Sequence, residues 1–372
     1  MFDSDRNLEI VTIAGNRPEI IKLSDLVKSM VGKYENAFAY TGQHFSSNMK
    51  DVFFAELGVK FDHDLQLNTS DVWILRENIR KLLERLHPSY VMVYGDTNST
   101  LAGALAAKDL NCKLIHVEAG LRCFDLSKPE ERNRIQVDSI SDYFLAPTEL
   151  SKLFLEYENI PSDKIFVTGN LIVDVCRKFS ASTPKLQQNL PPEYILLTLH
   201  RPALVDDPTM LKKLSLFLSR INYKMIFPVH PRTKARLAQY NINLPKNVIV
   251  IDAVGYLDFL NLLKNCMIVL TDSGGVQEEA IILKKPCITL NNVTERQETL
   301  LLRANRLFFP LDGDQQEKSI NDTIEEMLHA KITVNPYGEN VTEKALDALS
   351  NIINNENRKE KIKPEVSLFY KH

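Results

Sequence analysis

The sequence lacks the cysteine pattern of a disulfide-bonded or zinc-binding protein. Its five cysteines, in a chain of 372 residues, are scattered and odd in number, and none forms a CxxC pair. Such usage is typical of a reducing compartment. No apolar run approaches the ~18 residues that a membrane span needs, and the polar start MFDSDRNLEI is unlike a secretory signal. We therefore expect a cytoplasmic protein that does not contact a membrane.

The sequence also lacks a strong charge of either sign. The formal net charge is −3, with 44% hydrophobic and 25% charged residues. This balance is typical of a globular protein and gives no electrostatic reason to expect nucleic acid or an anionic membrane as a partner. A chain of this length exceeds one common core, so we expect two domains.

Several catalytic motifs are missing. No GxGxxG follows an apolar strand, which argues against a tightly bound nicotinamide. The sequence contains neither a GxxxxGK[ST] phosphate loop nor a GxSxG nucleophile elbow. No HExxH or cysteine cluster suggests a metal site. We therefore predict that the protein uses no cofactor and no metal.

Short apolar runs alternate with longer amphipathic segments along most of the chain. This pattern predicts parallel β-sheets covered by helices on both faces, an α/β fold. The predicted strands are residues 8–14, 90–95, 113–117, 143–147 and 165–169, followed by 194–200, 224–230, 247–252, 267–271 and 286–290.

A stretch rich in Pro, Ser and Gln interrupts the pattern at 179–193 and is interpreted as a linker. We therefore predict an N-terminal domain at 1–178 and a C-terminal domain at 194–355, followed by a polar tail at 356–372. Both domains are expected to be doubly wound and Rossmann-like, and to face each other across a cleft. Ligands of such sheets bind at the carboxyl ends of the strands.

Polar side chains follow the predicted strands of the first half. Arg17 and Lys22 follow the first strand, and an arginine beside free helix amides suits an anion. Asp96 and Glu118 end two further strands. Each feature has a plainer interpretation as a helix start or an N-cap. Paired carboxylates, however, suit proton abstraction at carbon or assisted departure of a leaving group.

The segment TDSGGVQEEA is the strongest local signal in the second half. A strand ends, Ser273-Gly274-Gly275 turns, and a helix begins whose amides can hold a diphosphate. Glu278 or Glu279 could reach a ribose diol, although both could also be solvated. His200 and His230 end two strands of the same half; each is interpreted as either structural or part of the site.

The motifs together resemble one family. GNRPEIIK, GDTNST, HVEAGLR, PEERNR, PVHPRT, DSGGVQEEA, TERQE and NPYG occur in the order found in UDP-N-acetylglucosamine 2-epimerases of the non-hydrolysing, bacterial and archaeal type. The resemblance covers roughly residues 8 to 350. It implies a fold like that of the GT-B glycosyltransferases and a homodimer, which light scattering would test.

The resemblance further implies interconversion of UDP-GlcNAc and UDP-ManNAc. In this family UDP leaves C1 as the C2 proton is removed, giving 2-acetamidoglucal, and then adds back with a proton delivered to the opposite face. By family position, the acid/base residues are Asp96, Glu118, Glu130 and His200. The residues implied in UDP-sugar binding are Arg17, Lys22, His230, Ser273, Gly274, Gly275, Glu279 and Arg296. Glu131, next to Glu130, is interpreted as a carboxylate that stabilises the helix start.

Three departures from the family pattern leave alternatives open. Pro202-Ala203-Leu204 follows His200-Arg201 where Arg-Glu or Glu-Glu is usual, TERQE replaces TERPE, and NPYGEN replaces NPYGDG. The alternatives are a hydrolysing epimerase that releases ManNAc and UDP, a 2-epimerase of a UDP-diacetamido-uronic acid, a non-catalytic UDP-sugar binding protein, and a GT-B glycosyltransferase.

Overall fold

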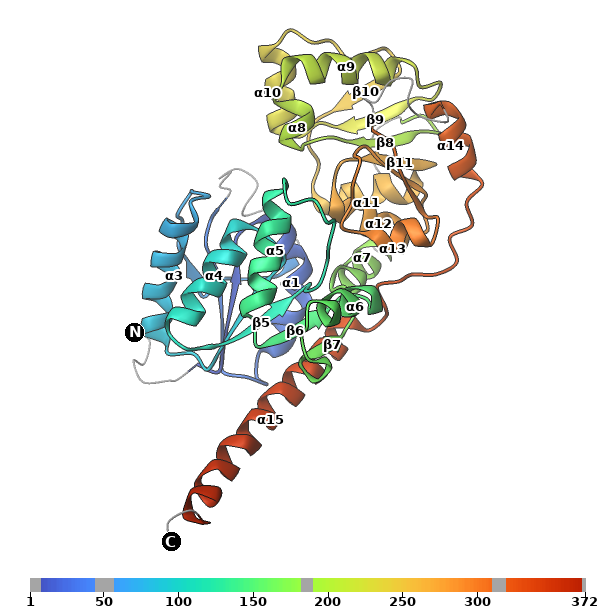
Figure 1. The fold of residues 1–372 in the computed structure, drawn as a ribbon. Coiled ribbons are helices and arrows are strands. Elements are labelled where there is room, and N and C mark those ends of the chain that lie inside the picture. The colour runs from blue at the N-terminus through green and yellow to red at the C-terminus, as the bar shows by residue number, and fades with distance from the viewer. Residues whose placement is uncertain (1–7, 44–56, 182–189, 310–318, 370–372) are drawn as a thin grey trace. The chain divides into compact units, whose positions relative to one another are not determined.

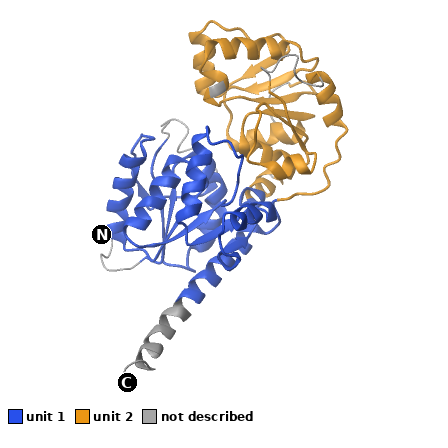
Figure 2. Ribbon diagram, in the orientation of Figure 1, with its two compact units in different colours: residues 1–174, 337–372 blue, residues 175–336 orange. Residues whose placement is uncertain are grey.

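The computed structural model of the chain describes residues 8–43, 57–181, 190–309 and 319–369 (Figure 1). It divides into two compact units, residues 1–174 with 337–372 and residues 175–336 (Figure 2). Each unit is built on one sheet, and every strand pairing in both sheets is parallel.

The first unit contains a seven-stranded sheet in the order β3-β2-β1-β4-β5-β6-β7. Its strands are β1 (Ile10–Ala14), β2 (Asn36–Tyr40), β3 (His63–Asp64), β4 (Tyr90–Tyr94), β5 (Lys113–Val117), β6 (Tyr143–Ala146) and β7 (Ile165–Val167). Its helices are α1 (Arg17–Met30), α3 (Val72–Leu86), α4 (Asn98–Asp109), α5 (Pro129–Ile140), α6 (Glu149–Tyr157) and α15 (Val341–Phe369), with a 3-10 turn at Ser162–Lys164.

Helices cover this sheet on both faces because its strands are apolar on both faces. Alternate residues of β1 and β4, such as Val11 and Val93, pack with Leu75 of α3, Leu101 of α4 and Val137 of α5 in one core. Helices α3, α4 and α5 lie side by side on that face (Figure 1). The intervening residues of β1 and β4 are buried as well, as expected of strands in a covered parallel sheet.

The second unit contains a six-stranded sheet in the order β10-β9-β8-β11-β12-β13. Its strands are β8 (Ile195–Thr198), β9 (Met225–Pro228), β10 (Val248–Ile251), β11 (Ile268–Thr271), β12 (Cys287–Thr289) and β13 (Asn305–Leu307). Its helices are α8 (Pro202–Val205), α9 (Pro208–Ser219), α10 (Pro231–Gln239), α11 (Tyr256–Asn265), α12 (Gly274–Ile282), α13 (Gln297–Leu301) and α14 (Ile320–Leu328), and α7 (Ile172–Ala181) spans the boundary between the units.

Two cores, one on each face, hold the second sheet. Leu197 of β8 and Leu270 of β11 belong to a core that includes residues of α9 and α14. Leu196 and Val269, the next residues of the same strands, belong to another core with residues of α11 and α12. The prediction of two doubly wound parallel α/β sheets is therefore confirmed.

The C-terminal helix α15 packs in the first unit. The sequence instead predicts a C-terminal domain at 194–355 that includes the start of this helix. The Tyr34 hydroxyl lies 2.7 Å from Ser350 Oγ, and the Tyr143 hydroxyl donates a hydrogen bond to the Glu356 carboxylate. The predicted tail at 356–372 continues this helix as far as Phe369. Of the predicted linker, 182–189 lies outside the described residues, and 179–181 completes α7.

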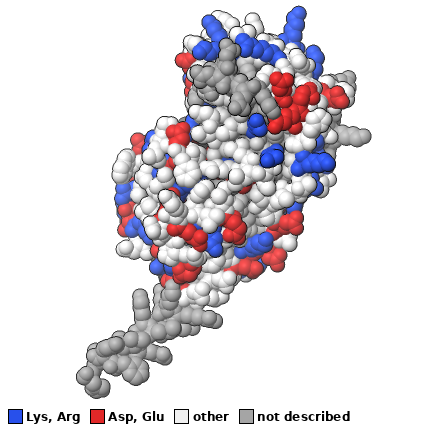
Figure 3. All heavy atoms as spheres, turned by 45° about the vertical axis from the view of Figure 1, so that its right-hand side comes forward, with Lys and Arg blue, Asp and Glu red and all other residues white. Residues whose placement is uncertain are grey.

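All ten predicted strands are present, each within two residues of its predicted start and end. The short strands β2, β3 and β13 were not predicted. Lys and Arg side chains are interspersed with Asp and Glu over the face drawn in Figure 3. Within the described ranges, no helix combines the length and the hydropathy that crossing a bilayer requires.

Candidate active site

Each sheet has a point at which its strand order reverses, between β1 and β4 in the first unit and between β8 and β11 in the second. In doubly wound folds, ligands bind beyond the carboxyl ends of the strands at this point. Most predicted site residues follow these four strands: Arg17 and Lys22 after β1, Asp96 after β4, His200 after β8, and Ser273, Gly274 and Gly275 after β11.

The turn between β1 and α1 is tightly packed. The Asn16 side chain accepts a hydrogen bond from Glu19 N at 3.0 Å, which caps the helix. Gly15 N donates to Glu19 Oε2 at 2.6 Å. A Cβ on Gly15 would lie 2.2 Å from Ser99 Oγ, so only glycine fits beside α4. The cap holds half-buried Arg17 in the first turn of the helix.

Glu19 is a further buried carboxyl group, outside the predicted site residues. Its side chain is in the first turn of α1, and the residue is 4% exposed. The pKa of Glu19 is raised to about 8, mainly by burial and to a smaller extent by the charge of Asp96, although the hydrogen bond from Gly15 N opposes the shift. A carboxyl group in this environment holds its proton at neutral pH.

Glu118 directly follows β5, and three side chains contact its carboxylate. Its Oε2 lies 2.5 Å from Lys22 Nζ, 2.5 Å from the Tyr94 hydroxyl and 3.3 Å from Asn170 Nδ2. The residue is 6% exposed, and its φ of 67° lies in the left-handed region that non-glycine residues seldom adopt. Lys22, which the resemblance implies in contacting the diphosphate or supporting the site, is an ion-pair partner of Glu118 in this structure.

Asp96 follows β4 and shares an arginine with a second carboxylate. Arg134 of α5 forms an ion pair with Asp96 through Nη2, and its Nη1 lies 2.5 Å from Glu131 Oε2. Glu131 also accepts hydrogen bonds from Cys123 N at 3.0 Å and Phe124 N at 2.8 Å. Glu131 therefore links the loop before α5 to Arg134, which is more than the helix-end role expected for it.

Glu130 behaves differently from its neighbour. It lies in the first turn of α5, which Pro129 opens, and its side chain is exposed, whereas Glu131 is fully buried. Within the described part of the chain, Glu130 makes no side-chain hydrogen bond to Asp96 or Glu118. An exposed carboxylate at a helix start is accessible to a ligand, so Glu130 stays a predicted acid/base residue.

A buried network connects the turns that carry Asp96 and Glu118. His116 of β5 is 0% exposed; its Nδ1 lies 2.6 Å from Asp138 Oδ1 and its Nε2 lies 2.7 Å from Gly95 O. Asp138 also accepts from Gly120 N at 3.2 Å and pairs with Arg122 at 2.7 Å. Burial raises the pKa of Asp138, but His116 and Arg122 outweigh burial and hold it below its usual value.

In the second unit, buried Asp272 organises the end of β8. Its Oδ2 accepts hydrogen bonds from the backbone N–H groups of His200 at 2.8 Å and Arg201 at 2.7 Å. Its Oδ1 lies 3.0 Å from His200 Nδ1. The His200 side chain is 43% exposed, and its ring centroid lies 6.1 Å from that of His230, at the end of β9. The two predicted histidines are therefore neighbours.

Helix α12 starts at Gly274, as the SGG motif predicts. Its first amides are the type of group that binds phosphate at a helix N-terminus. A Cβ on Gly274 would lie 2.6 Å from Glu295 Oε1, whereas a Cβ on Gly275 would meet nothing closer than Ser273 Oγ at 4.0 Å. The Glu295 carboxylate thus approaches the helix start closely, and it lies 3.6 Å from Arg201 Nη2.

The paired acidic residues of α12 have different surroundings. Glu278 is fully buried, and its Oε1 lies 2.5 Å from Nε of Arg296, itself 4% exposed. Glu279, predicted to contact ribose, is 6% exposed, and its charge helps to raise the pKa of Tyr256 after burial itself. The predicted site residue Arg296 is therefore fixed to α12 by Glu278.

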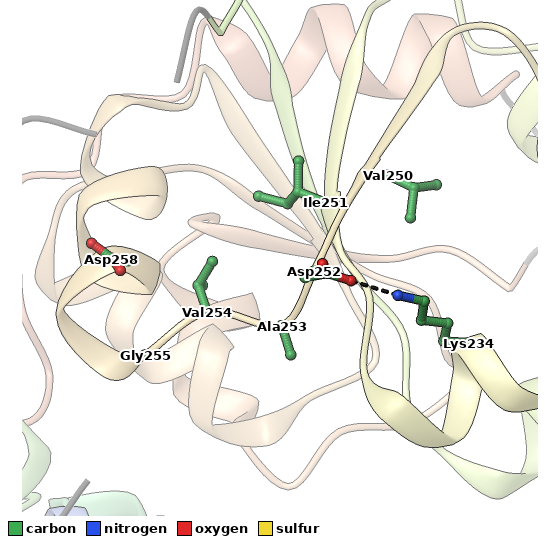
Figure 4. Close-up of a pocket in the computed structure, with 8 residues that line it drawn as sticks. All are labelled: Lys234, Val250, Ile251, Asp252, Ala253, Val254, Gly255 and Asp258. Carbon is green, nitrogen blue, oxygen red and sulfur yellow. Dashed lines mark hydrogen bonds and ion pairs between the residues drawn. The ribbon is translucent and has the colours of Figure 1, made fainter. Parts of the chain in front are cut away.

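A hollow of about 570 Å³ opens at the carboxyl end of β10, at the same edge of the second sheet as the start of α12 (Figure 4). The chain from Val250 to Gly255 forms much of its wall, and Asp252 pairs there with Lys234 at 2.5 Å. Among the described residues, no three His, Cys, Asp or Glu side chains are grouped as metal ligands.

Sequence reasoning missed the residues that hold the predicted ones in place. These are Tyr94 and Asn170 beside Glu118, Arg134 beside Asp96, and Asp272 beside His200. Glu131, which contacts Arg134, was expected only to stabilise the helix start. Several are within the motifs that carry the family resemblance, such as Asp272 in DSGGVQEEA and Arg134 in PEERNR. Tyr94, Asn170 and Asp272 lie at or near strand ends, which was a usable signal, whereas Glu131 and Arg134 lie within α5.

Two parallel-sheet units, with polar residues at the reversal point of each sheet and a glycine-started helix in the second, define a GT-B-like α/β protein. The sequence model of the family described as UDP-N-acetylglucosamine 2-epimerase matches residues 31–350. The chain belongs to this family, and the resemblance seen in the motifs is confirmed.

Individual relatives agree with this assignment. The chain is 42% identical over 354 residues to a UDP-N-acetylglucosamine 2-epimerase of Methanocaldococcus jannaschii, covering 89% of this chain and 95% of that protein. It is 38% identical to a UDP-2,3-diacetamido-2,3-dideoxy-D-glucuronate 2-epimerase of Pseudomonas aeruginosa, covering 81% and 88%. A crystal structure of the M. jannaschii UDP-GlcNAc 2-epimerase in complex with UDP-GlcNAc and UDP matches with a TM-score of 0.85 and 38% identity, covering 93% of this chain and all of that one.

Proposed function

We propose that the protein interconverts UDP-GlcNAc and UDP-ManNAc by inverting the configuration at C2, without hydrolysis. The observation that supports this most directly is the buried Glu118 carboxylate, at the end of β5 and paired with Lys22 at 2.5 Å. A buried carboxylate held in one orientation by several donors is pre-positioned for proton transfer at a carbon of the sugar. Family membership and the relatives named above support the substrate.

The reaction requires a proton acceptor, a proton donor and a stabilised leaving group. One carboxylate takes the C2 proton while the C1–O bond breaks, a C1=C2 double bond forms, and UDP departs with the electron pair. UDP then adds back to C1, and a proton donor delivers a proton to the opposite face of C2. We assign the two proton transfers to the set Asp96, Glu118 and Glu130, with His200 assisting.

The leaving diphosphate needs positive potential. The amides at the start of α12, from Ser273 to Gly275, supply partial positive charge. Arg17, His230 and Arg296 are further proposed contacts of the UDP-sugar. Glu279 is the proposed partner of the ribose, and the hollow at β10 is large enough for the base.

An NMR time course with UDP-GlcNAc in D2O tests the proposal. UDP-ManNAc that carries deuterium at C2 is the expected product, since the proton exchanges with solvent between abstraction and return. Free ManNAc with UDP would show the hydrolysing reaction instead. Binding of UDP without any C2 exchange would contradict catalysis on this sugar.

A second candidate substrate is favoured by one specific similarity. The relative from P. aeruginosa, 38% identical to this chain, is named for a UDP-diacetamido-glucuronate. The same NMR experiment with that sugar separates the two. A kcat/KM at least tenfold higher for the diacetamido-uronate would assign it as the substrate, with the same chemistry at C2.

A further inference from the structure

Tyr94 is the last residue of β4, a fully buried strand that carries a tyrosine at each end. Tyr90, Met92 and Tyr94 alternate with Val91 and Val93, which pack toward α3 and α4. Tyr94 is 3% exposed. A buried tyrosine hydroxyl needs a hydrogen-bond partner, and this one lies 2.5 Å from Glu118 Oε2.

Tyr94 contacts both members of the buried ion pair. Its hydroxyl lies on the same carboxylate oxygen that accepts from Lys22, and Lys22 Nζ lies 5.4 Å from the centroid of its ring. The arrangement therefore combines a hydrogen bond to the anion with a cation–π contact to the ammonium. Asn170 Nδ2, at 3.3 Å, contacts the same oxygen.

The backbone conformation of Glu118 and the hydroxyl of Tyr94 together restrict the orientation of the Glu118 side chain. A left-handed φ of 67° restricts the direction in which the side chain leaves the turn. Donors on Oε2 then hold the carboxylate plane. Neutral donors favour the ionised carboxylate without adding charge to the buried site.

We propose that Tyr94 is a positioning residue, which orients the Glu118 carboxylate for proton transfer at the sugar and keeps it paired with Lys22. This inference rests on the proposed function and deepens it. It assigns a role to a residue that does not itself exchange a proton with the substrate.

The test compares two phenylalanine variants on one strand. Tyr94→Phe removes the hydroxyl and keeps the ring. Tyr90→Phe is the matched control, because Tyr90 lies on the same face of β4, is 5% exposed and is at the opposite end of the strand. We expect Tyr94→Phe to lower kcat for C2 exchange roughly tenfold or more, the effect of losing one hydrogen bond to a charged group, with KM changed less than threefold. Tyr90→Phe should keep the wild-type kcat.

The pH profile separates positioning from a purely structural effect. The titratable side chains that contact Glu118 are Lys22 on α1 and Tyr94 on β4, and Gly95, the residue before Asp96, lies beside Glu118 Oε1. Loss of one donor weakens the ionised form, so the acid limb of kcat/KM should move to higher pH in Tyr94→Phe alone. Equal rates and equal acid limbs in the two variants would overturn the inference.

Two further measurements keep the test decisive. If Tyr94→Phe does not fold, Tyr94→His restores a ring N–H donor and should retain more activity than Tyr94→Leu; equal activity would count against the inference. Infrared difference spectra against Glu118→Gln report the Glu118 carboxylate stretch without turnover. If the wild-type protein shows no C2 exchange, the proposed function fails, and a shifted stretch in Tyr94→Phe still supports the contact, whereas an unshifted one overturns it.

Discussion

Asp272 and His200 are joined through both oxygens of one carboxylate, Oδ2 to the His200 backbone N–H at 2.8 Å and Oδ1 to the ring Nδ1 at 3.0 Å. Burial raises the pKa of Asp272, but its hydrogen bonds and the His200 ring outweigh burial and hold the pKa below its usual value. The buried Asp272 carboxylate thus holds the exposed His200 imidazole in place.

Asp272→Asn should lower kcat/KM for C2 exchange at least tenfold and lower the stability of the second unit by about 1–3 kcal/mol, because the two backbone N–H groups lose a charged acceptor. Thermal unfolding and the NMR assay measure the two effects. Asp322→Asn is the control, since Asp322 is exposed in the same unit. An unaffected Asp272→Asn variant would contradict the role assigned to Asp272.

Glu130 and Glu131 are neighbours with opposite environments, so two variants separate catalysis from structure. Glu130→Gln should keep the wild-type thermal stability and lose most C2 exchange, because Glu130 is exposed and proposed as an acid/base group. Glu131→Gln should lower the melting temperature, because Glu131 accepts from two backbone N–H groups and from Arg134. Calorimetry and the exchange assay on both variants test this; the reverse pattern would exchange the two roles.

Much of the fold could be predicted from the sequence because buried parallel strands form continuous apolar runs. Strands β2, β3 and β13 were missed. β3 has only two residues, so it is too short to show a period, and it is specified by pairing with β2. The packing of α15 against the first unit could not be predicted from the local sequence either, because it depends on contacts such as that of Tyr34 with Ser350, 316 residues apart.

The site could be predicted in part for a related reason. Strand ends and glycine turns are local, so Asp96, Glu118 and Ser273 are recognisable from short motifs. Ion pairs are not local. Lys22 and Glu118 are 96 residues apart and meet because β1, β4 and β5 are adjacent in the sheet. Their pairing follows from strand order, which a single sequence does not display.

The network around Asp138 makes a prediction about stability. Asp138 is 0% exposed and contacts His116, Arg122 and Gly120 N. Asp138→Asn leaves the buried Arg122 with less compensating charge, so it should destabilise the first unit by about 3–5 kcal/mol. Chemical denaturation measures the loss. Asp163→Asn, in the exposed 3-10 turn Ser162–Lys164, is the control and should unfold like the wild type.

Glu19 makes a prediction about pH. Its pKa is about 8 in the folded protein, against a usual value of 4.5, because the group is buried and lies near Asp96. Between these two values the folded state keeps a proton that the unfolded state releases. The contribution of this protonated carboxyl is fully present below about pH 4.5 and is lost as pH rises through about 8, roughly 5 kcal/mol in total.

Glu19→Gln isolates this contribution, because glutamine can still accept the hydrogen bond from Gly15 N and does not titrate. The free energy of unfolding of the variant, relative to wild type, should therefore increase between pH 5 and pH 8 and level off above the folded pKa. Chemical denaturation at three pH values measures that difference. Glu149→Gln, at an exposed first-turn position of α6, should follow the wild type at every pH. A difference between Glu19→Gln and wild type that does not change with pH would mean that Glu19 is ionised throughout. The buried turn beside β1 would then have to supply a compensating positive charge.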